Sequence, residues 1–315
     1  MKRRKLKLTF IIIGTLLGLF FVSVGGYAYY LYHSVKQTAQ EVYKPLSKDE
    51  DDVLPLDKSR SKDAKKTAEE ESPPAINILL LGVDERKGDK GRSDTMIVAT
   101  LNPRKKALTM TSIPRDTRVH IEGRSGFSKI NAAYAYGDEA LAVQTVEDYL
   151  NIDIAYYVKI NMEGLDNLVD AVGGVTVNNT LDWKDSDFHF TTGTLHLNGK
   201  EALAYSRMRH DDPQGDFGRN ERQRQVIQAI INQGKSLIAV KNINTILSAL
   251  GDNVQTNLSF SDMKLLATDY RDCRQKISNY EVQGTPKYLD GVSWVLVSDE
   301  ERQHVHDLIE TAFKG

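Results

Sequence analysis

The chain has 315 residues, of which 40% are hydrophobic and 27% are charged, and its formal net charge is -2. This length and composition fit a globular protein of one large or two small domains. The near-neutral charge argues against general nucleic-acid binding, which requires a basic surface, and the single cysteine, Cys273, excludes an intramolecular disulfide and a cysteine-based zinc site.

The N-terminus combines a basic tail with a long apolar run. Lysines and arginines fill most of residues 1–7, and residues 8–32 contain no charged side chain. A helix needs about 20 residues to span a bilayer, and the tyrosines that end this run suit the membrane interface. We predict a cytoplasmic tail over 1–7, a transmembrane signal anchor over 8–32 and an extracellular remainder. A cleaved signal peptide is the alternative, which the length of the run and the lack of a small-x-small site disfavour.

Residues 33–75 are polar and charged and close on two prolines. Such a segment has little to bury, so its composition predicts a linker that is at most partly helical. The folded domain is expected to occupy residues 76–315.

Within that domain, short apolar runs predict strands, and apolar residues at helical spacing predict helices. The predicted strands are Ile76–Val83, Met96–Leu101, Ala107–Ile113, Ile154–Ile160, Val175–Val177, Ile277–Val282 and Val292–Val297. The predicted helices are Asp138–Leu150, Met162–Val172, Arg219–Gly234, Ile238–Leu250, Ser261–Cys273 and Asp299–Phe313. This mixture indicates a single domain of the α/β class, with a mixed central sheet covered by helices on both faces.

Charged residues flank the loop after the first strand. Asp84 stands directly after that strand, and Arg92 and Asp94 precede the second one. Ligands of open α/β sheets bind beyond the carboxyl ends of strands, and carboxylates together with phosphate oxygens commonly hold magnesium. The alternative is that both aspartates only form turns at strand ends.

Arginines recur in two further places. Arg115 and Asp116 follow the third strand, and the run from Ser206 to Arg224 holds five arginines among acids, glycines and a proline. Arginine presents a planar fork of donors that matches phosphate oxygens, so this run predicts a loop and a helix that grip a phosphorylated ligand. A salt-bridged solvent face is the alternative for the run alone. The recurrence of arginine and aspartate at strand ends favours an anion site with a metal.

Other chemistries have less support in the sequence. The Gly-x-Ser-x-Gly nucleophile elbow, the Gly-x-x-x-x-Gly-Lys-Ser/Thr phosphate loop and the His-Glu-x-x-His zinc pattern are absent. Lys129 and Asn131 could line a pocket, although the start of a helix is the plainer account of them.

Together these segments resemble the LytR-CpsA-Psr family of bacterial cell-envelope proteins. The resemblance covers the N-terminal anchor and about residues 76–234, and it rests on short stretches in a fixed order. They are Leu80-Leu81-Gly82-Val83-Asp84, Arg92-Ser93-Asp94-Thr95, Ile113-Pro114-Arg115-Asp116, Lys129-Ile130-Asn131, Gly173-Gly174-Val175, Leu197–Leu203 followed by Arg207-x-Arg209, and Asp216-Phe217-Gly218-Arg219-x-x-Arg222-Gln223. The chain looks most similar to the teichoic-acid-ligating branch.

The resemblance implies a membrane-anchored phosphotransferase. It would move a glycopolymer, here wall teichoic acid, from a polyprenyl-pyrophosphate carrier to a sugar hydroxyl of peptidoglycan, with the lipid in an apolar groove. Its partners would be the carrier-linked polymer, peptidoglycan and membrane lipid, and not nucleic acid. A regulator of the transcriptional-attenuator type, another binding protein, and a hydrolase of lipid-carrier pyrophosphates are the alternatives.

That function requires the negative charge of a pyrophosphate to be neutralised as its bridging oxygen departs, and the residue roles follow from this requirement. The catalytic residues would be Arg115, Arg219 and Asp84. The substrate would be bound by Arg92, Arg118, Arg207, Arg209 and Gln223. Asp84 and Asp94 would hold Mg2+. Asp84 is the first candidate for the base that activates the acceptor hydroxyl, and Asp216 is the second.

Overall fold

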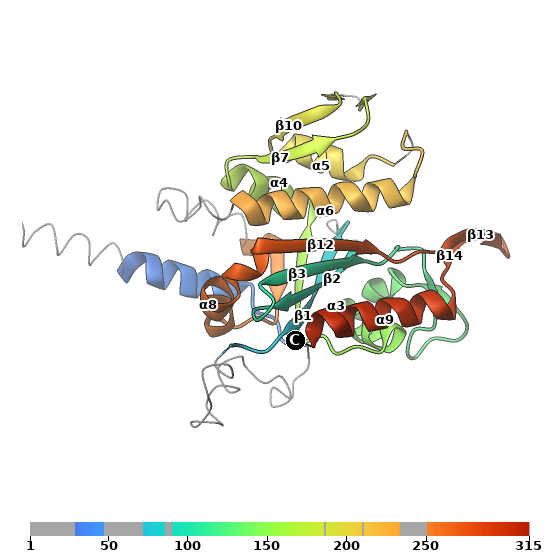
Figure 1. Cartoon of the computed structure of the whole chain (residues 1–315), viewed down its shortest axis with the longest axis horizontal. Coiled ribbons are helices and arrows are strands. Elements are labelled where there is room, and N and C mark those ends of the chain that lie inside the picture. Colours follow the sequence, from blue (N-terminus) through green and yellow to red (C-terminus); the bar gives the residue numbers. More distant parts are fainter. Residues whose placement is uncertain are drawn as a thin grey trace, which may run out of the picture.

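A mixed six-stranded sheet forms the centre of the molecule (Figure 1), with the strand order β11-β6-β1-β2-β3-β12. The computed structural model describes residues 29–46, 72–85, 90–185, 187–209, 211–233 and 251–314. The strands of the sheet are β1 (Ile76–Val83), β2 (Ser93–Asn102), β3 (Ala107–Ser112), β6 (Tyr156–Asn161), β11 (Val254–Thr256) and β12 (Lys276–Glu281). Because β2 is antiparallel to both β1 and β3, the carboxyl ends of β1 and β3 lie at the same edge as the start of β2.

Helices cover both faces of this sheet, as predicted. The helices are α3 (Ala132–Leu150), α4 (Met162–Ala171), α5 (Gly199–Arg207), α6 (Asp216–Gln233), α8 (Phe260–Asp269) and α9 (Asp299–Phe313). Side chains alternate along a strand, so Leu79 and Leu81 of β1 pack in one core with α3 and α9. Ile78 points the other way and packs in a core that includes residues of α6 and α8. The α/β class and the mixed sheet are therefore confirmed.

A smaller outer layer lies beyond α6, on the side away from the sheet (Figure 1). Its strands are β7 (Val175–Asn179), β8 (Trp183–Lys184), β9 (His189–Phe190) and β10 (Gly193–Leu197). Val226 of α6 packs in this outer core with α4 and α5, whereas Ile227 and Ile231 pack in the core against the sheet. Helix α6 is thus held from two sides, and this fixes the direction of each of its arginines.

Small elements close the remaining edges of the domain. They are β4 (Arg118–Val119), β5 (Ser128–Lys129), β13 (Thr285–Leu289), β14 (Val292–Leu296) and the 3-10 turns Gly251–Asn253 and Arg271–Gln275. The predicted strand Val292–Val297 is the second half of the β13–β14 hairpin, whose turn residues Asp290 and Gly291 both have positive φ. The hairpin projects beyond the N-terminal end of α9 (Figure 1).

The segment over residues 29–46 packs on the domain. It begins as a helix (blue in Figure 1), and Ala39 and Val42 are buried. The Lys44 N–H donates to the Thr256 carbonyl at 2.8 Å, and the Thr256 N–H donates to the Val42 carbonyl at 2.9 Å. This segment therefore extends the sheet beside β11.

Lys44 also begins a chain of charges that leads into the domain. Its Nζ lies 2.7 Å from Glu139 Oε2, and Glu139 Oε1 lies 3.4 Å from Lys159 Nζ, which pairs with Glu85 Oε2 at 3.1 Å. The polar linker expected over residues 33–75 is corrected in its first part, because buried apolar residues and an ion pair tie that part to the domain.

Helix α3 also starts earlier than predicted, at Ala132 instead of Asp138. The helix bends at Gly137 and Asp138, where the backbone is not helical. The predicted helix Ile238–Leu250 and most of the predicted anchor over 8–32 lie outside the described residues. Within the part of the chain that the structure describes, no helix has the length and apolarity that a membrane crossing needs.

Candidate active site

A polar cleft opens at the sheet edge where β1 and β3 end and β2 begins. It has a volume of about 730 Å³. Its lining residues are Asp84, Gly91, Arg92, Asp94, Arg115, Asp116, Lys129, Asn131, Ala135, Arg209 and Ser293. The topology of the sheet therefore gathers the charged residues that follow or precede three different strands in the sequence.

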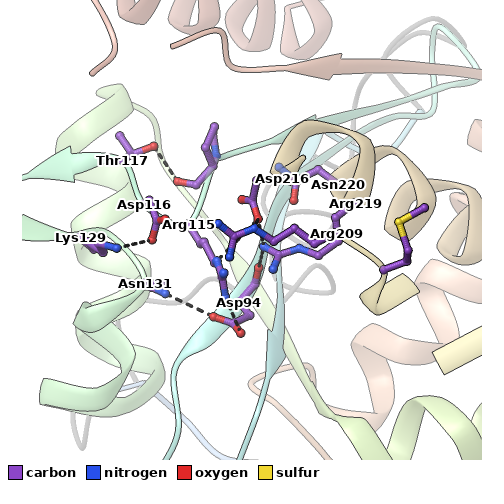
Figure 2. A network of polar contacts seen from close by, with 12 residues as sticks. Asp94, Arg115, Asp116, Thr117, Lys129, Asn131, Arg209, Asp216, Arg219 and Asn220 are labelled. Atoms are coloured by element: carbon purple, nitrogen blue, oxygen red, sulfur yellow. Dashed lines mark hydrogen bonds and ion pairs between the residues drawn. The ribbon is translucent and has the colours of Figure 1, made fainter. Parts of the chain in front are cut away.

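Asp216 is the centre of a cluster of arginines beside this cleft (Figure 2). Its Oδ1 lies 2.7 Å from Arg219 Nη2 and 3.7 Å from the Nε atoms of both Arg115 and Arg209. Arg115 Nη1 also pairs with Asp94 Oδ2 at 2.9 Å. Three guanidinium groups thus share two carboxylates, which leaves a formal excess of one positive charge in the cluster. Such a cluster is suited to bind an anion.

The surroundings of these arginines perturb their protonation in opposite directions. Burial lowers the pKa of Arg219, and the positive charges of Arg115 and Arg209 lower it further against the opposing effect of Asp216. Burial also acts to lower the pKa of Arg115, but the carboxylates of Asp94 and Asp216 outweigh it and raise this pKa above its usual value. Both side chains are cations at neutral pH, and an added anion would relieve the repulsion between them.

Several polar atoms at the cleft lack a hydrogen-bond partner among the described residues. They are Arg115 Nε, Arg219 Nε, Asn131 Oδ1 and both carboxylate oxygens of Asp216, and all five are buried. Buried polar atoms are nearly always hydrogen-bonded in native proteins. The described residues therefore leave part of the hydrogen-bonding capacity of this cluster unused.

The loop after β1 is shaped by Gly91. Its φ is +65°, and a Cβ atom at this position would lie 2.2 Å from the Asp84 carbonyl oxygen, so only glycine fits. The Asp84 N–H donates to the Arg92 carbonyl at 3.2 Å. This close approach brings the start of β2 next to the end of β1, with Asp94 on the cleft wall.

The carboxylates suit a divalent cation only in combination with a ligand. No cluster of three or more histidine, cysteine, aspartate or glutamate side chains that could hold a metal occurs among the described residues. Asp84 and Asp94 line the same cleft, and the amide oxygen of Asn131 lies buried without a partner. Magnesium usually binds one or two carboxylates and completes its shell with water and substrate phosphates. The donors in this cleft fit that pattern.

A second, apolar cavity of about 360 Å³ lies between the sheet and helices α4 to α6. Its walls come from β1 and β6 on one side and from α4 and α6 on the other, and Arg207 and Gln223 are among its few polar residues. Leu81 and Gly82 line this cavity just before Asp84 in the chain, and Thr95 lines it just after Asp94. The end of β1 and the start of β2 therefore separate the apolar cavity from the polar cleft.

The structure places the predicted site residues in three groups. Asp84, Arg92, Asp94, Arg115 and Arg209 line the cleft. Arg219 does not line it, but Asp216 joins Arg219 to the lining residues Arg115 and Arg209. Arg207 and Gln223 line the apolar cavity instead. Arg118 lines neither the cleft nor the apolar cavity, and its guanidinium carbon lies 3.4 Å from the ring centroid of Phe127.

Sequence reasoning missed two polar side chains of the cleft and left two others undecided. Asp116, which pairs with Lys129 at 2.9 Å, and Ser293 were not assigned to the site. Lys129 and Asn131, for which the start of a helix was the plainer account, both line the cleft. Asp116 could have been found from its place beside Arg115, whereas no local pattern marks Ser293.

Two of the five arginines in the run from Ser206 to Arg224 stabilise the fold. Arg222 donates from Nε to the Tyr205 carbonyl, from Nη1 to Asp212 Oδ2 and from Nη2 to the Met208 carbonyl. Arg224 donates to Ser112 Oγ at 2.7 Å and is also buried. Both guanidinium groups are engaged by protein atoms.

Comparisons with known proteins show which family this chain resembles. The model of the LytR_cpsA_psr family matches residues 29–310. The polyisoprenyl-teichoic acid–peptidoglycan teichoic acid transferase TagU of Bacillus subtilis (strain 168) is 41% identical over 291 residues, which cover 92% of this chain and 91% of that protein. The crystal structure of B. subtilis TagU superposes with a TM-score of 0.63 and 36% identity, covering 77% of this chain and 98% of that one. A structure of TagT bound to LI-WTA gives a TM-score of 0.65 and 29% identity, over 81% and 96% of the two chains.

Proposed function

This chain belongs to the LytR-CpsA-Psr family, and we propose on that premise that it transfers a teichoic acid from a polyisoprenyl-pyrophosphate carrier to a hydroxyl of peptidoglycan. The observation that carries the proposal is the junction of two cavities. A cleft lined by arginines suits a pyrophosphate, and the apolar cavity on the other side of the β1 and β2 ends suits a prenyl chain. The relative from B. subtilis is named for a donor and an acceptor of these kinds.

The proposed transfer exchanges one phosphorus–oxygen bond for another. The acceptor hydroxyl oxygen attacks the phosphorus that carries the teichoic acid, and the bond from that phosphorus to the bridging oxygen breaks. Polyisoprenyl phosphate leaves with the electron pair of that bond. Arg115 and Arg219 are placed to stabilise the negative charge that develops on the phosphate oxygens.

The proton of the acceptor hydroxyl passes to a carboxylate in this proposal. Both oxygens of Asp216 are buried beneath guanidinium groups, whereas Asp84 lines the cleft into which the hydroxyl would enter. Asp84 is therefore the base that we propose, ahead of Asp216.

Mg2+ is the cofactor that we propose, with Asp94 and one carboxylate oxygen of Asp84 as its protein ligands, so that the other oxygen of Asp84 accepts the proton. Bound there, it would supply positive charge to the pyrophosphate oxygens. Arg115 holds Asp94 at 2.9 Å and so orients this carboxylate toward the cleft.

We also propose that the chain is anchored in the cell membrane by residues 8–32, with residues 1–7 in the cytoplasm and the domain outside. The uncharged run supports this topology, and the helix described over residues 29–41 would connect the anchor to the domain. Protease added to intact cells tests the topology, because it should cleave the domain and leave the tail protected.

The transfer is tested with the full chain and the Arg115→Ala variant. Each is incubated with a polyisoprenyl-pyrophosphate-linked sugar, uncrosslinked peptidoglycan and either Mg2+ or a chelator, and the glycan product is analysed by mass spectrometry. We expect a phosphodiester adduct that requires Mg2+ and that falls about 10²–10³-fold in the variant, as for the loss of one charge-stabilising donor.

Arg104→Ala is the matched control, since Arg104 is exposed in the turn at the opposite end of β2 and β3. The adduct formed by this variant should equal that of the wild type. Free sugar phosphate without an adduct would instead support a hydrolase. Bound donor without any turnover would support a binding or regulatory protein.

A further inference from the structure

Next to the polar cleft, four planar side chains stand in a row that the proposed transfer does not use. The Arg118 guanidinium carbon lies 3.4 Å from the ring centroid of Phe127 and 5.8 Å from that of Trp294, and the His120 ring centroid lies 3.9 Å from that of Phe127. Phe127 is 43% exposed, although aromatic side chains of this size are mostly buried. We call these four residues the aromatic platform.

The aromatic platform continues directly from the cleft wall. In the β4–β5 ladder Arg118 pairs with Lys129, so both side chains lie on the same face of that ladder. Lys129 lines the cleft and is neutralised by Asp116. On the neighbouring hairpin, Ser293 lines the cleft and Trp294 follows it in the chain. Both strands therefore lead from the cleft to the platform.

Backbone contacts hold the platform in place relative to the reacting groups. The Val295 N–H donates to the Asp116 carbonyl at 2.9 Å, and this bond joins the β13–β14 hairpin to the loop that carries Arg115. Trp294 Nε1 donates to the Leu289 carbonyl at 3.4 Å within the hairpin. The indole N–H is thus used locally, and what the platform offers to a ligand is ring faces and the charge of Arg118.

Arg118 makes no ion pair with any carboxylate that the structure describes. Its guanidinium carbon lies over the rings of Phe127 and Trp294, so its N–H groups remain for hydroxyl, carbonyl or carboxylate oxygens. Ring faces next to hydrogen-bond donors suit a ligand that has apolar C–H faces and polar edges, which is the chemistry of a pyranose sugar.

We propose that the aromatic platform binds N-acetylated sugars of the acceptor glycan that flank the reacting sugar. This inference rests on the proposed transfer to peptidoglycan. The donor lipid also carries sugars, so the position of the platform decides between the two substrates. Val119 and Ile130, which belong to β4 and its neighbourhood, pack in the core on the α3 and α9 face of the sheet, whereas the apolar cavity lies on the α6 face.

This placement matches the geometry of phosphoryl transfer. The attacking oxygen and the leaving oxygen lie roughly in line on opposite sides of the phosphorus. A leaving polyisoprenyl phosphate that extends into the apolar cavity therefore requires the acceptor to approach from the opposite side of the cleft. Lys129, Ser293 and the aromatic platform lie on that side. Figure 1 shows the β13–β14 hairpin at the far end of the sheet from α8.

The binding test uses the intrinsic fluorescence of the full chain in detergent. The chain has only two tryptophans, and Trp183 is 6% exposed in the outer core, so a change in emission on adding an N-acetylglucosamine tetramer or soluble glycan strands reports on Trp294. We expect a saturable change in the wild type. Phe127→Ala should weaken the apparent affinity about tenfold, since one aromatic stacking partner is lost.

The kinetic test compares Trp294→Ala, Trp294→Phe and Phe127→Ala in the transfer reaction. We expect the alanine variants to raise the KM for acceptor glycan about tenfold, with the KM for the lipid-linked donor unchanged, and Trp294→Phe to restore most of the loss because it keeps a ring face. Phe260→Ala is the matched control, because Phe260 also lies beside a cation, Lys264, but on α8.

Two results would overturn the proposal. One is an unchanged acceptor KM in both alanine variants, and the other is a raised KM for the donor instead. Phe127→Ala keeps the test decisive if Trp294→Ala does not fold. If the wild type forms no adduct at all, the proposed transfer fails, and the fluorescence titration still decides whether the platform binds glycan.

Discussion

Arg219 and Arg222 lie three residues apart on α6, yet they belong to two different kinds of charged cluster. Arg222 directs its donors to two carbonyls and to Asp212, a carboxylate that is itself buried. Arg219 shares Asp216 with two other arginines, and its Nε has no hydrogen-bond partner among the described residues. The two side chains are almost equally buried, at 7% and 6% exposure.

Burial of an arginine therefore does not distinguish a structural role from a functional one. The distinction lies in how completely protein atoms use its donors. All three side-chain nitrogens of Arg222 donate to protein atoms. Gly218 is needed beside this pair, because a Cβ atom there would lie 1.9 Å from Asp212 Oδ2. Arg219 keeps an Nε–H without an acceptor, and the positive charges of Arg115 and Arg209 repel its guanidinium. An incoming phosphate would reduce that repulsion.

The largest effect that we expect comes from breaking the structural cluster. Arg222→Met leaves Asp212 buried without its cation and should lower the free energy of unfolding by about 3–5 kcal/mol. Chemical denaturation monitored by circular dichroism measures this loss. A double change, Arg222→Met with Asp212→Leu, removes both charges and should recover part of it. Equal stability of the single variant and the wild type would refute the structural role of Arg222.

At Arg219 we expect a large change in transfer activity but only a small change in the free energy of unfolding. Arg219→Gln should reduce transfer about 10²–10³-fold, since a charge-stabilising donor is lost. The free energy of unfolding should change by less than about 1.5 kcal/mol, because Arg115 and Arg209 remain near Asp216. Single-turnover assays and denaturation of the same preparation separate the two quantities. A variant that unfolds as readily as Arg222→Met would remove the contrast between the clusters.

The smallest effect is a dependence of stability on pH at Glu281, which contacts Arg224 and Asn220. Burial raises the pKa of Glu281, although the hydrogen bond from Asn220 and the charge of Arg224 oppose this. A raised pKa in the folded state means that the stability from this group is fully present below the unfolded-state pKa and is lost as the pH rises through the folded-state pKa. We expect Glu281→Gln to gain stability relative to the wild type over the pH range above the unfolded-state pKa of about 4.3. Thermal unfolding across that range is the measurement, and a constant difference would contradict the prediction.

The cleft itself was predictable because its first residues stand directly at strand ends. Asp84 and Arg115 each follow a buried apolar run that forms a strand. Residues that follow the carboxyl ends of neighbouring strands gather at one edge of a sheet. The contrast between Arg219 and Arg222 was not predictable in the same way. Both belong to one helix, and their directions depend on how α6 packs between the sheet and the outer layer, which is a tertiary effect.

Contacts that are distant in the sequence account for the other residues that were missed or misplaced. Ser293 reaches the cleft only because Val295 pairs with the loop at Asp116, and no local pattern predicts a contact over that separation. The position of Arg118 on Phe127 likewise depends on a short ladder between β4 and β5. The role of Lys44 was hidden by the polar composition of its surroundings.

The pairing of residues 42–44 with β11 has a practical consequence for any shortened form of this protein. A chain that starts at Ile76, where the apolar pattern begins, would lack the backbone groups that pair with Thr256 and would leave an open strand edge. Open edges promote aggregation. Such a chain would also remove the cation nearest to Glu139, a carboxylate that is 2% exposed. A soluble version that keeps the helix over residues 29–41 would retain both contacts.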